Sequence, residues 1–232
     1  MFRFKQFAVA QDRTAMKVGT DGVLIGAWSA VENTDRHLLD IGSGTGLIAL
    51  MLAQRSDAVV DAVEICSDSA AQAAENIAIS PWSQRINIHN VNIADFNQSY
   101  SYDLIVSNPP FFSNSLLPPD ESRTTARHTT SLTFEMLIAS VERLLSSSGR
   151  FALILPANES EEFESSSKGR LYLWRKCLVK SRVGSDCKRV MCEYRLAQAD
   201  DIQQTELAIR EAQSNEYTAE YRNLTADFYL KF

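Results

Sequence analysis

Short apolar runs alternate with helical stretches along most of the chain. The runs at residues 37–41, 59–64, 102–107 and 151–155 are apolar almost throughout, and residues 85–91 alternate apolar and polar side chains. Continuous apolar runs of this length are typical of strands buried on both faces of a parallel sheet. Because helical stretches separate them, the pattern predicts an α/β fold.

The remaining stretches predict the helices and the end of the sheet. Residues 70–77 and 134–145 place apolar side chains at helical spacing. Residues 190–196 and 226–232 are strand-like and could pair at the edge of the sheet. An acidic stretch around residues 206–216 predicts a helix between them.

Length and composition are those of one ordinary domain. The chain has 232 residues, a formal net charge of −6 and no internal repeat, so we expect a single domain over residues 1–232. No run is apolar enough to span a bilayer and the start lacks a signal core, which favours a cytoplasmic protein without an obligate protein partner. No Cys-x-x-Cys pair or histidine spacing indicates a metal, so we expect none.

A glycine-rich loop follows the first buried strand. Gly42, Gly44 and Gly46 come after Asp40, and residues 47–53 predict a helix behind them. This order of strand, loop and helix forms the βα turn that binds nucleotides, because glycine lets the backbone approach a ligand and the helix start offers free N–H groups.

The spacing of the glycines distinguishes between two possible cofactors. A nicotinamide site requires G-x-G-x-x-G, and its third glycine would fall at Leu47. The D-x-G-x-G-x-G spacing that starts at Asp40 is the S-adenosylmethionine pattern. Glu64 ends the second strand, where an acid can accept hydrogen bonds from both ribose hydroxyls. A glycine turn without a ligand is the alternative.

Asn108-Pro109-Pro110-Phe111 follows another buried strand. Two prolines make a stiff, extended corner that can present the Asn108 amide oxygen and the Pro109 carbonyl in one direction. Two acceptors beside the flat face of Phe111 suit a planar group that carries an NH2. Asn-Pro is also a common turn dipeptide, so the corner could simply end the strand; the glycine loop upstream favours a site.

Other positions are candidates for contact with the cofactor. Asp95 follows the alternating strand and could accept a hydrogen bond from the adenine amino group, or simply start a turn. Thr20 and Asp21 precede an apolar helical run, so they could cap that helix or lie at a helix start that takes a carboxylate ligand. With Lys17, they predict that residues 1–30 form an N-terminal extension that acts as a cofactor lid.

Two stretches are candidates for contact with nucleic acid. Residues 112–130 lack periodicity and leave the proline corner directly, so we expect a substrate-side loop in which Arg127 and His128 reach phosphate or base; a disordered surface loop is the alternative. Basic residues far outnumber acids over residues 168–189, which suggests phosphate contact as well as the usual solvated face. The candidates in this run are Arg175, Lys176, Lys188 and Arg189.

Together these motifs resemble the class I S-adenosylmethionine-dependent methyltransferases that carry an Asn-Pro-Pro-aromatic motif and modify planar NH2 nitrogens. Over nearly the whole chain the sequence is most similar to the bacterial tRNA1(Val) adenine(37)-N6 methyltransferases, which modify the adenosine on the 3′ side of the anticodon. The segments that carry this resemblance are Phe4–Trp28, Glu75–Ile77, Ser80–Trp82, Asn108–Phe112, Ala126–His128 and Asp227–Leu230.

The resemblance implies a fold, a cofactor and a substrate. The fold would be a seven-stranded, mostly parallel Rossmann-like sheet with an antiparallel last strand and helices on both faces. S-adenosyl-L-methionine would become S-adenosyl-L-homocysteine, with Asp40 and the glycine loop at the methionine part, Glu64 at the ribose and Asp95 at the adenine. Asn108, Pro109, Pro110 and Phe111 would be catalytic, and tRNA would be the partner.

Other functions fit the same motifs. An rRNA guanine-N2 methyltransferase shares the proline corner, although Phe112 stands where those enzymes commonly have histidine. A protein-glutamine N5 methyltransferase also shares it but should not need the basic run. An RNA-binding module without activity is an alternative from a different class, against which the intact corner argues.

Overall fold

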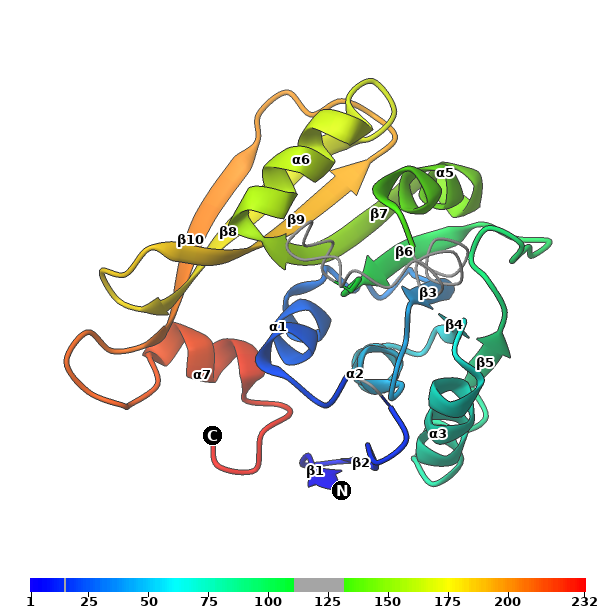
Figure 1. Cartoon of the computed structure of the whole chain (residues 1–232), viewed down its shortest axis with the longest axis horizontal. Helices are drawn as coiled ribbons and strands as arrows, with labels where there is room; N and C mark the ends of the chain where they lie inside the picture. Colours follow the sequence, from blue (N-terminus) through cyan, green and yellow to red (C-terminus); the bar gives the residue numbers. More distant parts are fainter. Residues whose placement is uncertain (15, 111–131) are drawn as a thin grey trace, which may run out of the picture.

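A computed structural model describes residues 1–14, 16–110 and 132–232 (Figure 1). Its main sheet has eight strands in the order β10–β8–β9–β7–β6–β3–β4–β5. They are β3 (His37–Ile41), β4 (Val59–Glu64), β5 (Ile86–Asn90), β6 (Tyr102–Ser107), β7 (Leu145–Pro156), β8 (Tyr172–Arg182), β9 (Cys187–Arg195) and β10 (Gln203–Arg210). A small antiparallel sheet pairs β1 (Phe2–Arg3) with β2 (Ala8–Val9).

The predicted α/β class is confirmed, with one strand more than expected. Strands β3 to β7 pair in parallel, β9 runs antiparallel to both of its neighbours, and β10 pairs in parallel with β8 at the edge. The antiparallel strand is therefore the penultimate strand of the chain and not the last. The additional strand is β10.

Helices cover both faces of the sheet (Figure 1). One face packs against α1, α2, α3 and α7, and the other against α5 and α6. Successive strand residues supply the two hydrophobic clusters in turn, as the pleat requires: Leu38 joins the first cluster and Leu39 the second. The helices are α1 (Thr20–Trp28), α2 (Leu47–Arg55), α3 (Ser67–Ala78), α5 (Phe134–Leu144), α6 (Ala157–Ser167) and α7 (Ala219–Thr225).

Two predictions for the last part of the chain are wrong, whereas the strand predicted at residues 190–196 corresponds to β9. Residues 203–210 form strand β10 where a helix is expected, because Leu207 is buried against the sheet's first cluster and Glu206 pairs with Lys180 on β8. Residues 226–232 form no strand; they follow α7 as turns, and Phe228 is buried. The backbone N–H of Lys5 donates to the Phe228 carbonyl at 2.8 Å, so the two ends of the chain lie side by side.

Candidate active site

A cavity of about 510 Å³ lies at the carboxyl ends of β3, β4 and β6. Strand β3 stands between the other two, with Ile41 paired to Val63 on one side and to Ser107 on the other. Open α/β sheets bind ligands at such a point, where connections leave a central strand in opposite directions. The predicted glycine loop, Glu64 and Asn108 therefore meet at one edge of the sheet.

The glycine loop has a backbone that other residues rarely adopt. Gly42, Gly44 and Gly46 have φ of 75°, 54° and 79°, in the left-handed region that favours glycine. A Cβ at Gly42 or Gly44 would meet no atom within 4 Å, and both residues line the cavity. Gly46 does not line it; a Cβ there would lie 3.4 Å from the Cβ of Ala73 on α3. Two glycines thus open the loop to a ligand and the third packs it against a helix.

Asp40 supports this loop from behind. Its side chain is fully buried and does not line the cavity, and its Oδ2 accepts a hydrogen bond from the N–H of Ala49 in the first turn of α2 at 3.1 Å. Burial raises the pKa of Asp40 to about 7. Asp40 thus joins β3 to α2, and its contact with the methionine part stays a prediction.

Glu64 lines the cavity at the end of β4. Its Oε2 accepts a hydrogen bond from the N–H of Gly44 and its Oε1 one from the N–H of Cys66, both at 2.8 Å. A carboxylate has about four acceptor positions, so two backbone donors leave capacity for hydroxyl groups. This placement suits the predicted ribose contact.

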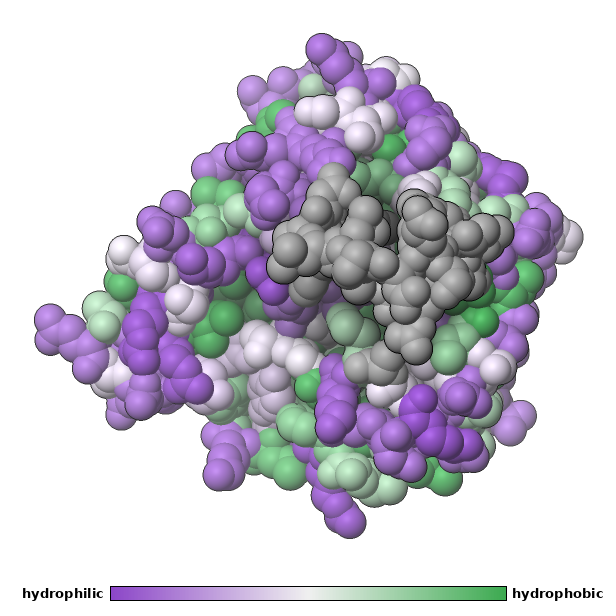
Figure 2. Space-filling view, viewed as in Figure 1, coloured by the Kyte–Doolittle hydropathy of each residue, from purple (hydrophilic) through white to green (hydrophobic). Residues whose placement is uncertain are grey.

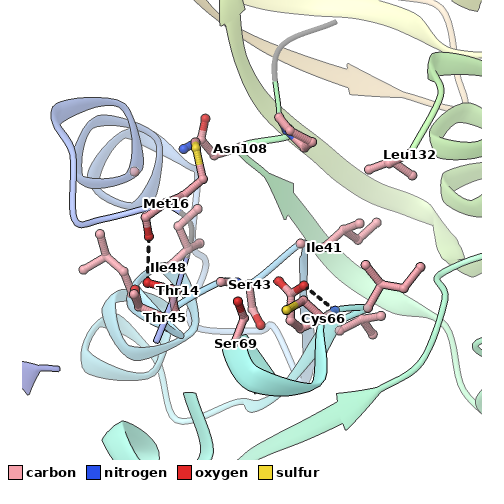
Figure 3. A pocket seen from close by; sticks show the side chains of 18 of the residues that line it. Thr14, Met16, Ile41, Ser43, Thr45, Ile48, Cys66, Ser69, Asn108 and Leu132 are labelled. Atoms are coloured by element: carbon pink, nitrogen blue, oxygen red, sulfur yellow. Dashed lines mark hydrogen bonds between the residues drawn. The ribbon is translucent and has the colours of Figure 1, made fainter. Parts of the chain in front are cut away.

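Asn108 and Pro110 line the cavity at the end of β6, and Pro109 is buried beside them. The Oδ1 of Asn108 is buried without a hydrogen-bond partner among the described residues. A buried polar atom of this kind normally has a partner, so the acceptor is available for a ligand. Figure 3 shows Asn108 and Met16 on one side of the cavity and Cys66 and Ser69 across it. Phe111 lies outside the described residues.

The start of α1 forms the wall next to Asn108. Lys17, Thr20 and Asp21 all line the cavity. Gly19 is the N-cap residue and no side chain caps the helix, so the alternative in which Thr20 or Asp21 serves as the cap is wrong. Asp21 Oδ2 instead accepts a hydrogen bond from the Arg189 Nε at 2.8 Å.

These features fit S-adenosylmethionine. The loop glycines leave open space for a ligand and Glu64 offers acceptors, while Asn108, whose Oδ1 has no described partner, lines the same cavity. Among the described residues no group of His, Cys, Asp and Glu could hold a metal ion.

Known proteins match the whole chain. The family model described as "Methyltransferase small domain" matches residues 27–165. The chain is 47% identical to the tRNA1(Val) (adenine(37)-N6)-methyltransferase of Bacteroides fragilis, over 99% of this chain and 98% of that protein. It belongs to the tRNA1(Val) (adenine(37)-N6)-methyltransferase family. The protein of the same name from Serratia proteamaculans is 45% identical, over 99% of this chain and 89% of that one.

The fold of this tRNA1(Val) methyltransferase family member recurs in solved structures. The crystal structure of a predicted O-methyltransferase, protein Atu636 from Agrobacterium tumefaciens, matches with a TM-score of 0.71 and 18% identity, over 90% of this chain and 96% of that one. The family and fold confirm the resemblance, the enzyme class and the cofactor predicted from the sequence, S-adenosylmethionine.

A further predicted cofactor residue of this family member does not line the cavity. Asp95 is exposed and does not line the cavity, whereas Asn92 and Ile93 do. The chain turns before Asp95, whose N–H donates to the Asn92 carbonyl at 2.9 Å. Sequence spacing could not locate this turn. The cavity is also lined by residues that were not among the predicted site residues, among them Thr14, Met16, Ser43, Cys66, Ser69 and Met136.

Acids partly neutralise the basic run of the family member. Hydrophilic side chains predominate over the β8–β10 side in Figure 2, and four of the eight cations in residues 168–189 have acidic partners. The ion pairs are Arg170 with Glu135 and Glu142, Arg175 with Glu193, Lys180 with Glu206, and Arg189 with Asp21.

The four residues of this run that were predicted to contact RNA therefore lie in different environments. Arg175 lies 3.8 Å from the centre of the Trp28 ring and donates to the buried Glu193, so it supports the sheet. Lys176 is half-buried in the middle of β8. Lys188 is exposed and Arg189 faces the cavity wall, at the carboxyl edge of the sheet. Arg127 and His128 lie outside the described residues.

Proposed function

We propose that this enzyme transfers a methyl group from S-adenosylmethionine to the exocyclic N6 of an adenosine in tRNA, namely the adenosine 3′ to the anticodon of tRNA1(Val). The similarity to named relatives over the whole chain supports the substrate. The observation that carries the chemistry is the buried, unpartnered Oδ1 of Asn108 in the wall of the cavity.

Asn108 would orient the adenine N6, which is a poor nucleophile. The N6 lone pair is delocalised into the ring, so the NH2 group reacts poorly. The Asn108 Oδ1 accepts one N–H and the Pro109 carbonyl the other, which holds the nitrogen with its lone pair directed at the methyl donor. Phe111 provides a flat face for the base and tolerates a nearby positive charge.

Positioning supplies much of the acceleration. S-adenosylmethionine carries the methyl group on a sulfonium, a good leaving group, so alignment of the two reactants is the main task of the protein. The glycine loop holds the methionine part together with the wall formed by Lys17, Thr20 and Asp21, and Glu64 holds the ribose hydroxyls. The base nitrogen loses its proton to solvent after transfer, so no side chain acts as a dedicated base.

The target base must leave its stack to reach Asn108. Single-stranded tRNA loops lower the cost of this movement, because their bases are already partly unstacked. Lys188 at the edge of the sheet, and Arg127 and His128 of the 112–130 stretch, are the side chains proposed to contact the tRNA. No described helix is long and apolar enough to cross a membrane. The proposed tRNA substrate supports the proposal that the enzyme acts in the cytoplasm.

Transfer of a labelled methyl group to tRNA tests this function. Total tRNA from a strain that lacks the gene is incubated with the protein and labelled S-adenosylmethionine, then digested to nucleosides. Label in N6-methyladenosine of one valine tRNA supports the proposal. Label in N2-methylguanosine keeps the chemistry but changes the base. No label in the tRNA overturns the proposal, and label in protein glutamine when extract of the same strain is added favours the protein-modifying alternative.

A further inference from the structure

Two walls of the cofactor cavity come from distant parts of the sequence. The glycine loop, residues 42–46, forms one wall; the N-terminal segment, which we define as residues 10–14 and 16–18, forms part of the other through Thr14, Met16, Lys17 and Val18. The segment has no regular secondary structure of its own. Its position must therefore be fixed by side chains of another element.

Helix α3 supplies those side chains. Asn76 is 1% exposed, and its amide makes a two-way contact with the backbone of Ala10: Oδ1 accepts from the Ala10 N–H at 2.8 Å, and Nδ2 donates to the Ala10 carbonyl at 2.9 Å. Gln72, also 1% exposed and one turn earlier, accepts from the Arg13 N–H at 2.9 Å. One face of α3 therefore fixes the N-terminal segment at two points.

The same asparagine also holds the glycine loop. Its Nδ2 donates a second hydrogen bond, to the Thr45 carbonyl, at 2.9 Å. Ala73, three residues earlier on α3, packs against Gly46. Asn76 is thus hydrogen-bonded to both walls at once, and every hydrogen-bonding atom of its amide has a partner.

We infer that Asn76 is a positioning residue for the cofactor: it sets the distance between the N-terminal segment and the glycine loop, although it does not line the cavity itself. The two walls close on one ligand, so a change in their separation changes the affinity for that ligand. Asn76 bonds to Ala10 and Thr45 and not to Asn108, which holds the reacting nitrogen, so the chemical step should change little. The inference rests on the cavity holding the cofactor and not on the choice of tRNA.

The variant Asn76→Asp tests this role with almost no change in shape. A carboxylate lacks both N–H donors and would place an oxygen against the carbonyls of Ala10 and Thr45. We expect the Kd of S-adenosylhomocysteine, measured by calorimetry well below the melting temperature, to rise about tenfold or more. At saturating S-adenosylmethionine, kcat should stay within about twofold of the wild type. Asn223→Asp is the matched control, because Asn223 is exposed on α7.

The outcomes separate a positioning role from a purely structural one. A lower melting temperature with an unchanged Kd overturns the inference. A raised Kd with an unchanged kcat supports it. If wild-type protein fails to bind S-adenosylhomocysteine, the assignment of the cavity to the cofactor fails first, and that result is independent of the Asn76 variants.

Hydrogen exchange on the wild-type protein decides the question if Asn76→Asp does not fold. Since binding and segment closure are linked, saturating S-adenosylhomocysteine should slow exchange of the Ala10 and Arg13 amides together with those of the glycine loop. Slower exchange in the loop alone, with Ala10 and Arg13 unchanged, would show that the segment is not coupled to the ligand and would overturn the inference.

Discussion

The Glu64 carboxylate at the end of β4 accepts a hydrogen bond from the N–H of Gly44 at 2.8 Å, and so holds the glycine loop that follows β3. The same side chain lines the cofactor cavity. One acid therefore shapes the loop and offers its remaining lone pairs to the ligand.

Glu64→Gln should weaken cofactor binding. A glutamine has one acceptor oxygen, so its NH2 group would face one of the two backbone donors, Gly44 or Cys66. We expect the Kd of S-adenosylhomocysteine to rise about ten- to a hundredfold, which corresponds to about 1.4–2.7 kcal/mol. Glu206→Gln, an exposed acid paired with Lys180 on an outer strand, is the control and should leave the Kd unchanged. Equal affinity in both variants would remove Glu64 from the site.

Gly42→Ala and Gly184→Ala should share a loss of stability but differ in cofactor affinity. Both glycines have a left-handed φ, 75° and 81°, and a Cβ at either would meet no atom within 4 Å. The backbone strain should lower the free energy of unfolding by about 1–2 kcal/mol in each variant. Only the Cβ of the Gly42 variant enters the cofactor cavity. Calorimetric titration should therefore show weaker S-adenosylhomocysteine binding for Gly42→Ala alone, and equal binding by the two variants would contradict the site.

Asp40 should make stability fall as pH rises from about 4 to about 7. Burial raises its pKa to about 7, so the folded protein binds more protons at this group than the unfolded chain does. Its contribution to stability is complete at low pH and is lost between about pH 4 and 7. Asp40→Asn keeps an acceptor for the Ala49 N–H and removes the titration. In urea unfolding, the free energy of unfolding of the variant should rise by a few kcal/mol relative to the wild type between about pH 4 and 7 and stay constant above pH 7. A difference between the two proteins that does not depend on pH would contradict the raised pKa of Asp40.

Asp61 should make stability fall as pH decreases, which is the opposite of the effect of Asp40. It is buried on β4 and accepts hydrogen bonds from Tyr100, Tyr102, Asn87 and His89. Burial alone would raise its pKa, but these hydrogen bonds outweigh it and the pKa is lowered. Its stabilisation is therefore present above the unfolded value near 4 and is lost as pH falls below that.

Asp61→Ala should leave the buried Tyr102 hydroxyl without an acceptor and cost roughly 2–4 kcal/mol at pH 7 in urea unfolding. Cofactor affinity should not change, because Asp61 does not line the cavity. The exposed Asp95→Ala is the control. A loss of less than about 0.5 kcal/mol at Asp61 would show that the cluster carries little net stability.

The sequence predicts the centre of the sheet better than its edge. Residues 37–41, 59–64 and 102–107 form the expected strands because they are apolar on both faces and bounded by glycine, acid or proline. The acidic stretch at 206–216 gives no such signal. Its first part joins the edge of the sheet because Leu207 is buried in the first hydrophobic cluster and Glu206 forms an ion pair with Lys180. Neither tertiary contact can be predicted from local periodicity.

The same limit applies to the site. Residues next to strand ends, such as Glu64 and Asn108, could be placed because strand ends fix their position. The position of Asp95 could not be predicted in this way, because a turn that begins at Asn92 directs the chain away from the cavity. The Lys168–Arg189 run could not be interpreted from local charge alone, because the acids that pair with Arg170 and Arg189 lie far away in the sequence.

The most direct test of the account is turnover of Asn108→Ala beside its cofactor affinity. Because Asn108 Oδ1 has no described partner, its removal should not lower the melting temperature, and the Kd of S-adenosylhomocysteine should stay within about threefold of the wild type. Single-turnover methylation of unmodified valine tRNA should fall by at least about a hundredfold, because the base nitrogen is no longer oriented. Wild-type turnover in a variant that binds both the cofactor and the tRNA would contradict the central role of Asn108.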